Sequence, residues 1–113
     1  MIKKNKLDEP FPLIYSNNVD DKMHWLEFLV PNWEKDKIWI HLGYLYIETT
    51  TMFNKKLANE YLLKYKKIIE KYKNQLEVFE KNKQPYKSFF YYCADSMIWA
   101  SNYVYLKNMI KSK

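Results

Sequence analysis

The sequence predicts an all-α protein, a small four-helix bundle with an extended N-terminal arm. Its 113 residues are enough for one domain and hardly for two. Over much of the chain the apolar residues recur at steps of three and four, which is the period of an amphipathic helix. No internal repeat or low-complexity tract interrupts this pattern, and short links join the predicted helices. We therefore expect an extended arm over residues 1–15 and a single helical domain over residues 16–113.

The arm is predicted because its residues have no helical period and include two prolines, Pro10 and Pro12. An arm of this composition usually becomes ordered when it is tied down, either on its own domain or on a partner. The expected anchors are Phe11, Leu13, Ile14 and Tyr15. The sequence leaves open whether they dock on the same chain or on another one.

Two helices are predicted to follow the arm. Asn17 or Asn18 can cap the first helix, and Pro31 ends it. Asn32 can cap the second helix, which is predicted to continue through residues 38–53.

Residues 38–53 are the ambiguous part of this second helix. Their β-branched and aromatic side chains favour a strand. The steps between Ile38, Leu42 and Leu45 instead follow the face of a helix. We predict a helix because Gly43 is the only residue in the run that suits a turn, and a hairpin needs more.

The third helix is the clearest predicted element. Its apolar residues alternate at steps of four and three from Ala58 to Phe79, and we expect it to end near Asn82. Pro85 suits the first turn of a fourth helix that runs to about Ile110. This fourth helix carries apolar side chains on two sides, so it packs centrally or lies between the bundle and another chain.

Charge and composition exclude several classes of function. All 19 basic residues are lysines, and the formal net charge is +6. Arginine is the usual bidentate reader of guanine, so its absence disfavours sequence-specific recognition of nucleic acid, while non-specific attraction to phosphates stays open. We find no signal peptide and no apolar run fit to span a membrane, and one unpaired cysteine suits a reducing compartment. We expect a cytoplasmic protein without a membrane partner.

Candidate catalytic residues are few. Asp20 and Asp21 precede His24 at helical spacing and could orient its ring or share a metal with it, although ordinary charges at a helix end explain them as well. His41 and Cys93 lie on apolar stretches, where buried structural roles are the usual ones. No phosphate loop, dinucleotide fingerprint or zinc-spaced cluster is present. The sequence therefore predicts a protein that is not an enzyme and has no metal or cofactor.

Aromatic residues point most directly to a function. Four Trp, eleven Tyr and six Phe make up 19% of the chain, which is more than a core of this size needs. Tyr and Trp are frequent interface anchors because they bury a large area and have few rotatable bonds. We expect these rings to bind another protein, or a second copy of the chain in a homodimer. The predicted protein-binding residues are Trp33, Tyr44, Ile47, Tyr91, Asp95, Ile98 and Tyr105.

Lysines of the third predicted helix support an alternative. Lys56, Lys64, Lys67 and Lys71 lie away from its apolar seam, and together with tyrosines they would suit a nucleic-acid-binding protein without sequence specificity. Glutamates between these lysines dilute the positive field.

In size and composition the chain resembles short lysine- and tyrosine-rich proteins of low-G+C bacteria, their phages and their plasmids. This resemblance implies an antagonist, such as an inhibitor of host defence, an antitoxin or an immunity protein. We therefore expect a protein that binds and blocks another protein, whose surface is acidic or binds nucleic acid.

Overall fold

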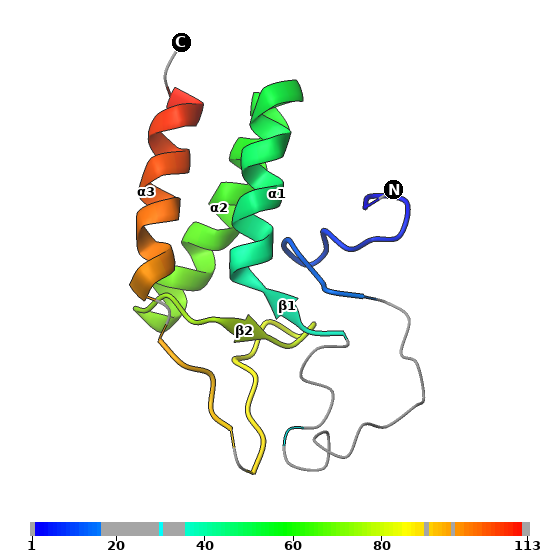
Figure 1. Cartoon of the computed structure of the whole chain (residues 1–113), viewed down its shortest axis with the longest axis vertical. Coiled ribbons are helices and arrows are strands. Elements are labelled where there is room, and N and C mark those ends of the chain that lie inside the picture. Colours follow the sequence, from blue (N-terminus) through cyan, green and yellow to red (C-terminus); the bar gives the residue numbers. More distant parts are fainter. Residues whose placement is uncertain (1, 17–29, 31–35, 90, 96, 112–113) are drawn as a thin grey trace.

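In the computed structural model the described part of the chain forms three helices and one two-stranded antiparallel sheet (Figure 1). The structure describes residues 2–16, 30, 36–89, 91–95 and 97–111, without the side chains of Met97 and Ile98. The elements in chain order are β1 (Ile38–Trp39), α1 (Ile40–Phe53), α2 (Lys55–Tyr72), β2 (Val78–Phe79) and α3 (Met97–Lys111). The prediction of a four-helix bundle is therefore wrong, although the fold is mostly helical.

The three helices lie side by side, and each contacts the other two. α2 runs antiparallel to α1 and α3, and the small sheet lies across the end where α1 and α3 begin (Figure 1). Asn54 joins α1 to α2, and its side chain accepts a hydrogen bond of 3.0 Å from the Leu57 N–H. This cap satisfies a backbone donor at the start of α2 and makes the reversal between the helices sharp.

Residues 38–53 are helical from Ile40 onward, as their spacing predicts. Ile38 and Trp39 instead form β1 and pair with β2, so the strand propensity of this segment is expressed only in its first two residues. Ile38 is fully buried, and β1 lies between β2, which pairs with it, and Ile14 of the arm, which forms a bridge to it.

α2 ends at Tyr72, well before the predicted end near Asn82. Lys73 adopts the left-handed conformation, with a φ of 56°, and this stops the helix. The apolar period continues to Phe79 because Val78 and Phe79 enter the same core as strand residues. Apolar residues at helical spacing therefore extend into a segment that forms a short strand, so the spacing alone does not reveal β2.

Residues 85–89 and 91–95 belong to a paired loop where the sequence predicts the start of the fourth helix. The Tyr86 N–H donates to the Val78 carbonyl at 3.0 Å, and the Cys93 N–H donates to the Tyr86 carbonyl at 3.1 Å. These bonds to β2 and within the loop satisfy backbone groups that a helix would pair internally. α3 consequently begins only at Met97.

The arm docks on its own domain. An isolated antiparallel bridge joins Ile14 to β1. Phe11 and Ile14 are buried, as expected of anchors, and Leu13 is half-buried. Tyr15, the fourth expected anchor, is exposed. The arm is therefore anchored in the core of the same chain through Phe11 and Ile14.

Some of the predicted elements lie outside the described ranges. These are the first helix, which falls on residues 17–29, and the beginning of the second helix at residues 32–35.

Candidate binding surface

α2 turns one side to the core and carries its charges on the others. Ala58, Tyr65 and Ile68 are buried against the neighbouring elements. The opposite side forms a row at steps of four and three, in which lysines predominate. This lysine row of α2 consists of Lys56, Glu60, Leu63, Lys67 and Lys71, all of them exposed.

α3 presents different side chains to each neighbouring helix. Tyr103, Lys107 and Lys111 recur at steps of four on the side that faces α2. Tyr105 lies on the side that faces α1, where its hydroxyl donates to Glu48 Oε1 at 3.4 Å. α3 therefore has a basic flank beside α2 and a more apolar flank beside α1.

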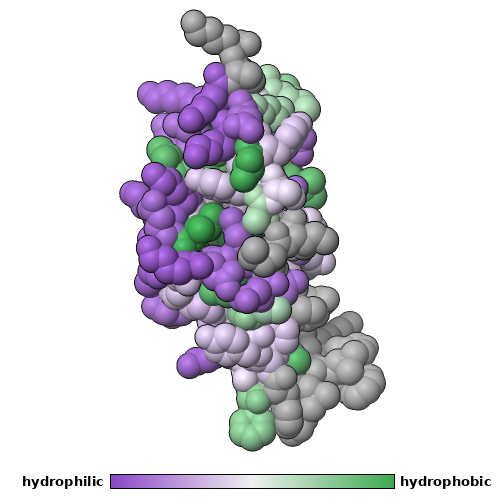
Figure 2. Space-filling model, turned by 90° about the vertical axis from the view of Figure 1, so that its left-hand side faces the viewer, coloured by the Kyte–Doolittle hydropathy of each residue, from purple (hydrophilic) through white to green (hydrophobic). Residues whose placement is uncertain are grey.

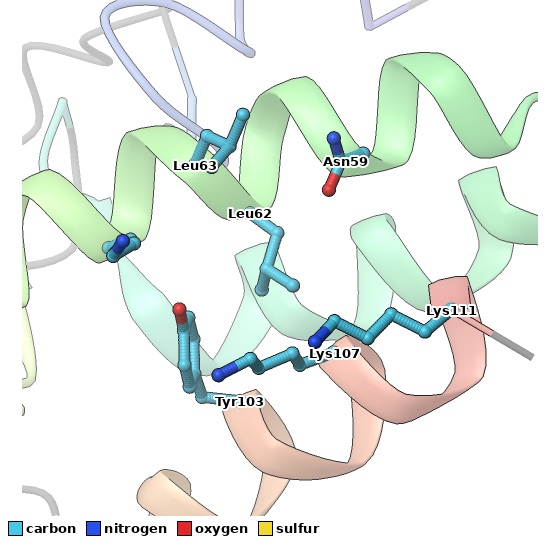
Figure 3. Close-up of a pocket in the computed structure, with 7 residues that line it drawn as sticks. Asn59, Leu62, Leu63, Tyr103, Lys107 and Lys111 are labelled. Carbon is cyan, nitrogen blue, oxygen red and sulfur yellow. The ribbon is translucent and has the colours of Figure 1, made fainter.

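A surface pocket of about 160 Å³ lies between α2 and α3 (Figure 3). Figure 3 shows the Leu62 side chain directed from α2 into the space between the helices, and the Lys107 and Lys111 side chains extended along α3. The pocket thus combines ammonium groups with an apolar wall. Its lining residues are Asn59, Leu62, Leu63, Lys66, Tyr103, Lys107 and Lys111.

The net charge of the chain is concentrated on these two helices. α2 contains six lysines and two glutamates, and α3 contains two lysines and no acidic residue. Together they carry a formal charge of +6, which equals the net charge of the whole chain. Figure 2 views the molecule from the α3 side and shows hydrophilic side chains over much of this face, with small hydrophobic areas between them.

An exposed apolar patch lies on the other flank of α3. Leu45 and Met52, two turns apart on α1, are 58% and 70% exposed, and Tyr105 on α3 is 52% exposed. Glu48 stands between the two α1 residues and accepts the Tyr105 hydrogen bond, which links the two helices across the patch. We call Leu45, Met52 and Tyr105 the apolar patch.

The predicted protein-binding residues do not form one surface. Tyr44 and Ile47 are buried, because α1 turns this side toward the core. The Tyr44 hydroxyl donates to Gln75 Oε1 at 2.8 Å, and burial raises its pKa well above the usual range. These two side chains are core residues, so we correct their prediction as protein-binding residues: neither is accessible to a partner.

Three other predicted residues are at least partly accessible. Tyr91 is half-buried and donates to Glu77 Oε2 at 3.1 Å. Asp95 is exposed and accepts a 2.5 Å hydrogen bond from the Asn74 amide. Tyr105 is exposed and belongs to the apolar patch.

The remaining two predicted protein-binding residues are not placed. Trp33 and the side chain of Ile98 lie outside the described part of the structure.

The four lysines of the alternative prediction all lie on α2. Lys56, Lys67 and Lys71 are exposed members of the lysine row. Lys64 is half-buried, and its ammonium lies 5.5 Å from the centre of the Tyr61 ring. The structure thus brings three of the four lysines into one row.

The candidate catalytic groups that the structure describes are engaged in packing. The His41 ring stacks on Trp99 at 5.2 Å, and burial lowers its pKa. Burial raises the pKa of the Cys93 thiol, whose sulfur accepts the Val78 N–H at 3.2 Å. Among the described residues no three His, Cys, Asp or Glu side chains lie together as metal ligands would. His24 lies outside the described ranges.

Sequence reasoning missed the pocket and most of the apolar patch. The repeat of Tyr103, Lys107 and Lys111 at steps of four is visible in the sequence. These three residues line a pocket only because α2 packs opposite them. The packing of α3 against α2 cannot be read from the repeat itself. Leu45 and Met52 fall on the apolar period of their helix. Because such a period usually indicates a buried face, the sequence does not show that these two side chains are exposed.

Comparison with known protein families, curated proteins and solved structures finds no match to this chain. None of the helices in the described part is both long and apolar enough to cross a bilayer.

Proposed function

We propose that this protein binds an acidic surface of a protein partner across α3 and blocks the contacts that this surface makes. The observation that carries the proposal is the location of the entire net charge on α2 and α3, next to an exposed apolar patch. Charge complementarity steers association, whereas buried apolar anchors hold a complex together. α3 separates these two kinds of surface and lies between them.

The apolar patch suits the anchoring role. Tyr105 is held by its hydrogen bond to Glu48, so less side-chain freedom is lost when a partner covers its ring. Leu45 and Met52 flank this position, and methionine adapts its shape to different partner surfaces. A partner that covers the patch would bury three large side chains at one point, as hot spots of interfaces do.

The lysines suit electrostatic steering of a partner toward this surface rather than specific recognition of individual groups on the partner. They are flexible point charges without the planar fork of arginine, and the lysine row is solvent-exposed. Exposed charges of this kind accelerate encounter and contribute little to the lifetime of a complex. We expect a partner whose binding face carries an excess of Asp and Glu.

The test is a capture experiment from cells that carry the gene, with the full chain as bait and with nuclease treatment. A captured protein is then purified, and its binding is measured with two pairs of variants. Tyr105→Ala removes an anchor, and Tyr92→Ala removes an exposed ring of the loop before α3 as its matched control. Lys67→Glu/Lys71→Glu reverses charges in the lysine row, and Lys3→Glu/Lys4→Glu makes the same change on the exposed arm.

We expect Tyr105→Ala to weaken binding by about tenfold or more, mainly through faster dissociation. The α2 charge reversal should slow association and flatten its salt dependence, whereas both controls should bind like the natural protein. Loss of the captured protein after nuclease treatment would overturn the proposal. It would favour the alternative, a non-specific nucleic-acid binder whose contacts are made by the lysine row.

A further inference from the structure

We infer that the pocket between α2 and α3 binds a phosphate monoester. The pocket is distinct from the apolar patch, because the two lie on opposite flanks of α3. The inference does not rest on the proposed protein partner. None of the variants that test the proposed function changes a residue that lines this pocket.

The positive groups of the pocket converge from two helices. Lys66 comes from α2, and Lys107 and Lys111 come from successive turns of α3. Because α2 and α3 run antiparallel, the end of α3 lies beside α2, and Lys66, Lys107 and Lys111 line one pocket between the two helices. Figure 3 shows the side chains of Lys107 and Lys111 there. Several flexible point charges around one space suit a tetrahedral oxyanion, which accepts hydrogen bonds from several directions.

The charge balance of the pocket favours a dianion. The lining residues include three lysines and no carboxylate. Glu70 is the acidic neighbour on α2, and it lies 3.5 Å from Lys66, which leaves a formal charge of +2. Lys107 and Lys111 form no ion pair within the described part of the structure. A phosphate monoester carries a charge between about −1.5 and −2 at pH 7, whereas a carboxylate or a phosphodiester would leave positive charge uncompensated.

The uncharged lining residues indicate what is attached to the phosphate. Leu62 is buried and Leu63 is partly exposed, so one wall can cover a short organic stem. The Tyr103 hydroxyl and the Asn59 amide add neutral hydrogen-bond donors. At about 160 Å³ the pocket is smaller than the roughly 300–1,000 Å³ of sites that enclose whole small molecules. It therefore accommodates one phosphate group and the atoms next to it.

The test is an NMR titration of the ¹⁵N-labelled full chain with phenyl phosphate and with methyl phenyl phosphate at pH 7.5. The diester keeps the ring and the phosphorus but has one negative charge. We expect saturable shifts centred on residues 59–66 and 103–111, and binding of the monoester that is about fivefold or more tighter. At pH 5 the monoester loses its second charge, because its second pKa is about 6, and its advantage over the diester should disappear.

Two variants with the same change of charge show where the ligand binds. Lys107→Gln should weaken binding of phenyl phosphate by about tenfold, and Lys67→Gln, in the lysine row outside the pocket, should leave it within about twofold. Both side chains are exposed, so both proteins should fold. Equal binding of monoester and diester, equal effects of the two variants, or the absence of saturable binding would each overturn the inference.

A second pair of ligands distinguishes the sources of the phosphate. These are a phosphoserine peptide and its unphosphorylated form. Tighter binding of the phosphopeptide than of phenyl phosphate assigns the group to a phosphorylated protein, and weaker binding assigns it to a free small molecule. Saturable binding of both peptide forms with equal affinity at these residues would contradict a phosphate pocket.

Discussion

Gly43, the only glycine of the chain, is required where α1 approaches α2 and the arm. A Cβ at this position would overlap the Tyr65 hydroxyl and the Pro12 carbonyl, which are hydrogen-bonded to each other. Alanine is about 1 kcal/mol better than glycine inside a helix, but overpacking typically costs about 1–3 kcal/mol. We expect Gly43→Ala to lower the free energy of unfolding by up to about 2 kcal/mol, the difference between these two effects, in urea titrations.

The matched control for this substitution is Thr49→Ala on the same helix. Thr49 is exposed, and its hydroxyl donates to the Leu45 carbonyl within α1. Its replacement should change the free energy of unfolding by no more than about 0.5 kcal/mol. A stabilising effect of Gly43→Ala would show that α1 and Tyr65 do not approach closely.

His41 makes the stability of the fold depend on pH. Burial lowers its pKa below the usual 6.5, and the nearby Glu77 opposes this shift. The unfolded chain therefore binds the proton more readily, so this contribution is present above pH 6.5 and is lost as the pH falls through the folded-state pKa. We expect the urea midpoint to fall from pH 7.5 to pH 5.5, and His41→Gln to reduce this fall. An equal fall in the variant would show that other groups cause it.

At the scale of elements, the arm is part of the fold rather than an appendage. Phe11 is 1% exposed, and its ring packs edge-on against Tyr65 and Phe79 at 5.7 and 5.4 Å. The arm thereby covers the junction of α2 and β2. We expect Phe11→Ala to lower the free energy of unfolding by about 3–5 kcal/mol, measured by urea denaturation.

Tyr15→Ala is the control for the arm, because this ring is exposed although it lies in the same segment. It should change the free energy of unfolding by no more than about 0.5 kcal/mol. Similar losses in the two variants would show that the arm is held by its backbone contacts and not by the Phe11 ring.

The elements also show how far periodicity predicts this fold. α1 from Ile40 and most of α2 follow from the spacing of their apolar residues. After Tyr72 the apolar spacing no longer predicts the secondary structure. Phe79 lies in a strand, but its side chain is buried in the core, at a position where the helical spacing also expects an apolar residue. In the loop before α3, pairing with β2 decides the conformation, and no local residue pattern reports such a distant partner.

The sequence predicts the types of residue in the candidate site, but it does not predict where on the fold they lie. Composition indicates aromatic anchors and non-specific lysine charge, and Tyr105 and three of the four predicted lysines of α2 are exposed. The sequence predicts Tyr44 and Ile47 as protein-binding residues although both are buried, because a helix with apolar residues on several sides does not show which side meets the core. The pocket depends on the contact between α2 and α3, which no single helix encodes.

At the scale of the whole molecule, charge is distributed unevenly. α2 and α3 carry the net +6, so the rest of the chain is neutral in sum. Binding to a polyanion depends on the local density of positive charge more than on the net value. The molecule should therefore present its helical face to a negatively charged surface.

Cation-exchange chromatography tests this orientation with two variants of identical net charge. Lys67→Glu/Lys71→Glu and Lys3→Glu/Lys4→Glu each reduce the formal charge by the same amount, and all four lysines are exposed. If the helical face contacts the resin, the α2 variant should elute at a clearly lower salt concentration than the arm variant, because only the former weakens the contacting face. Co-elution of the two variants would mean that net charge alone governs retention, and that the uneven distribution does not orient the molecule.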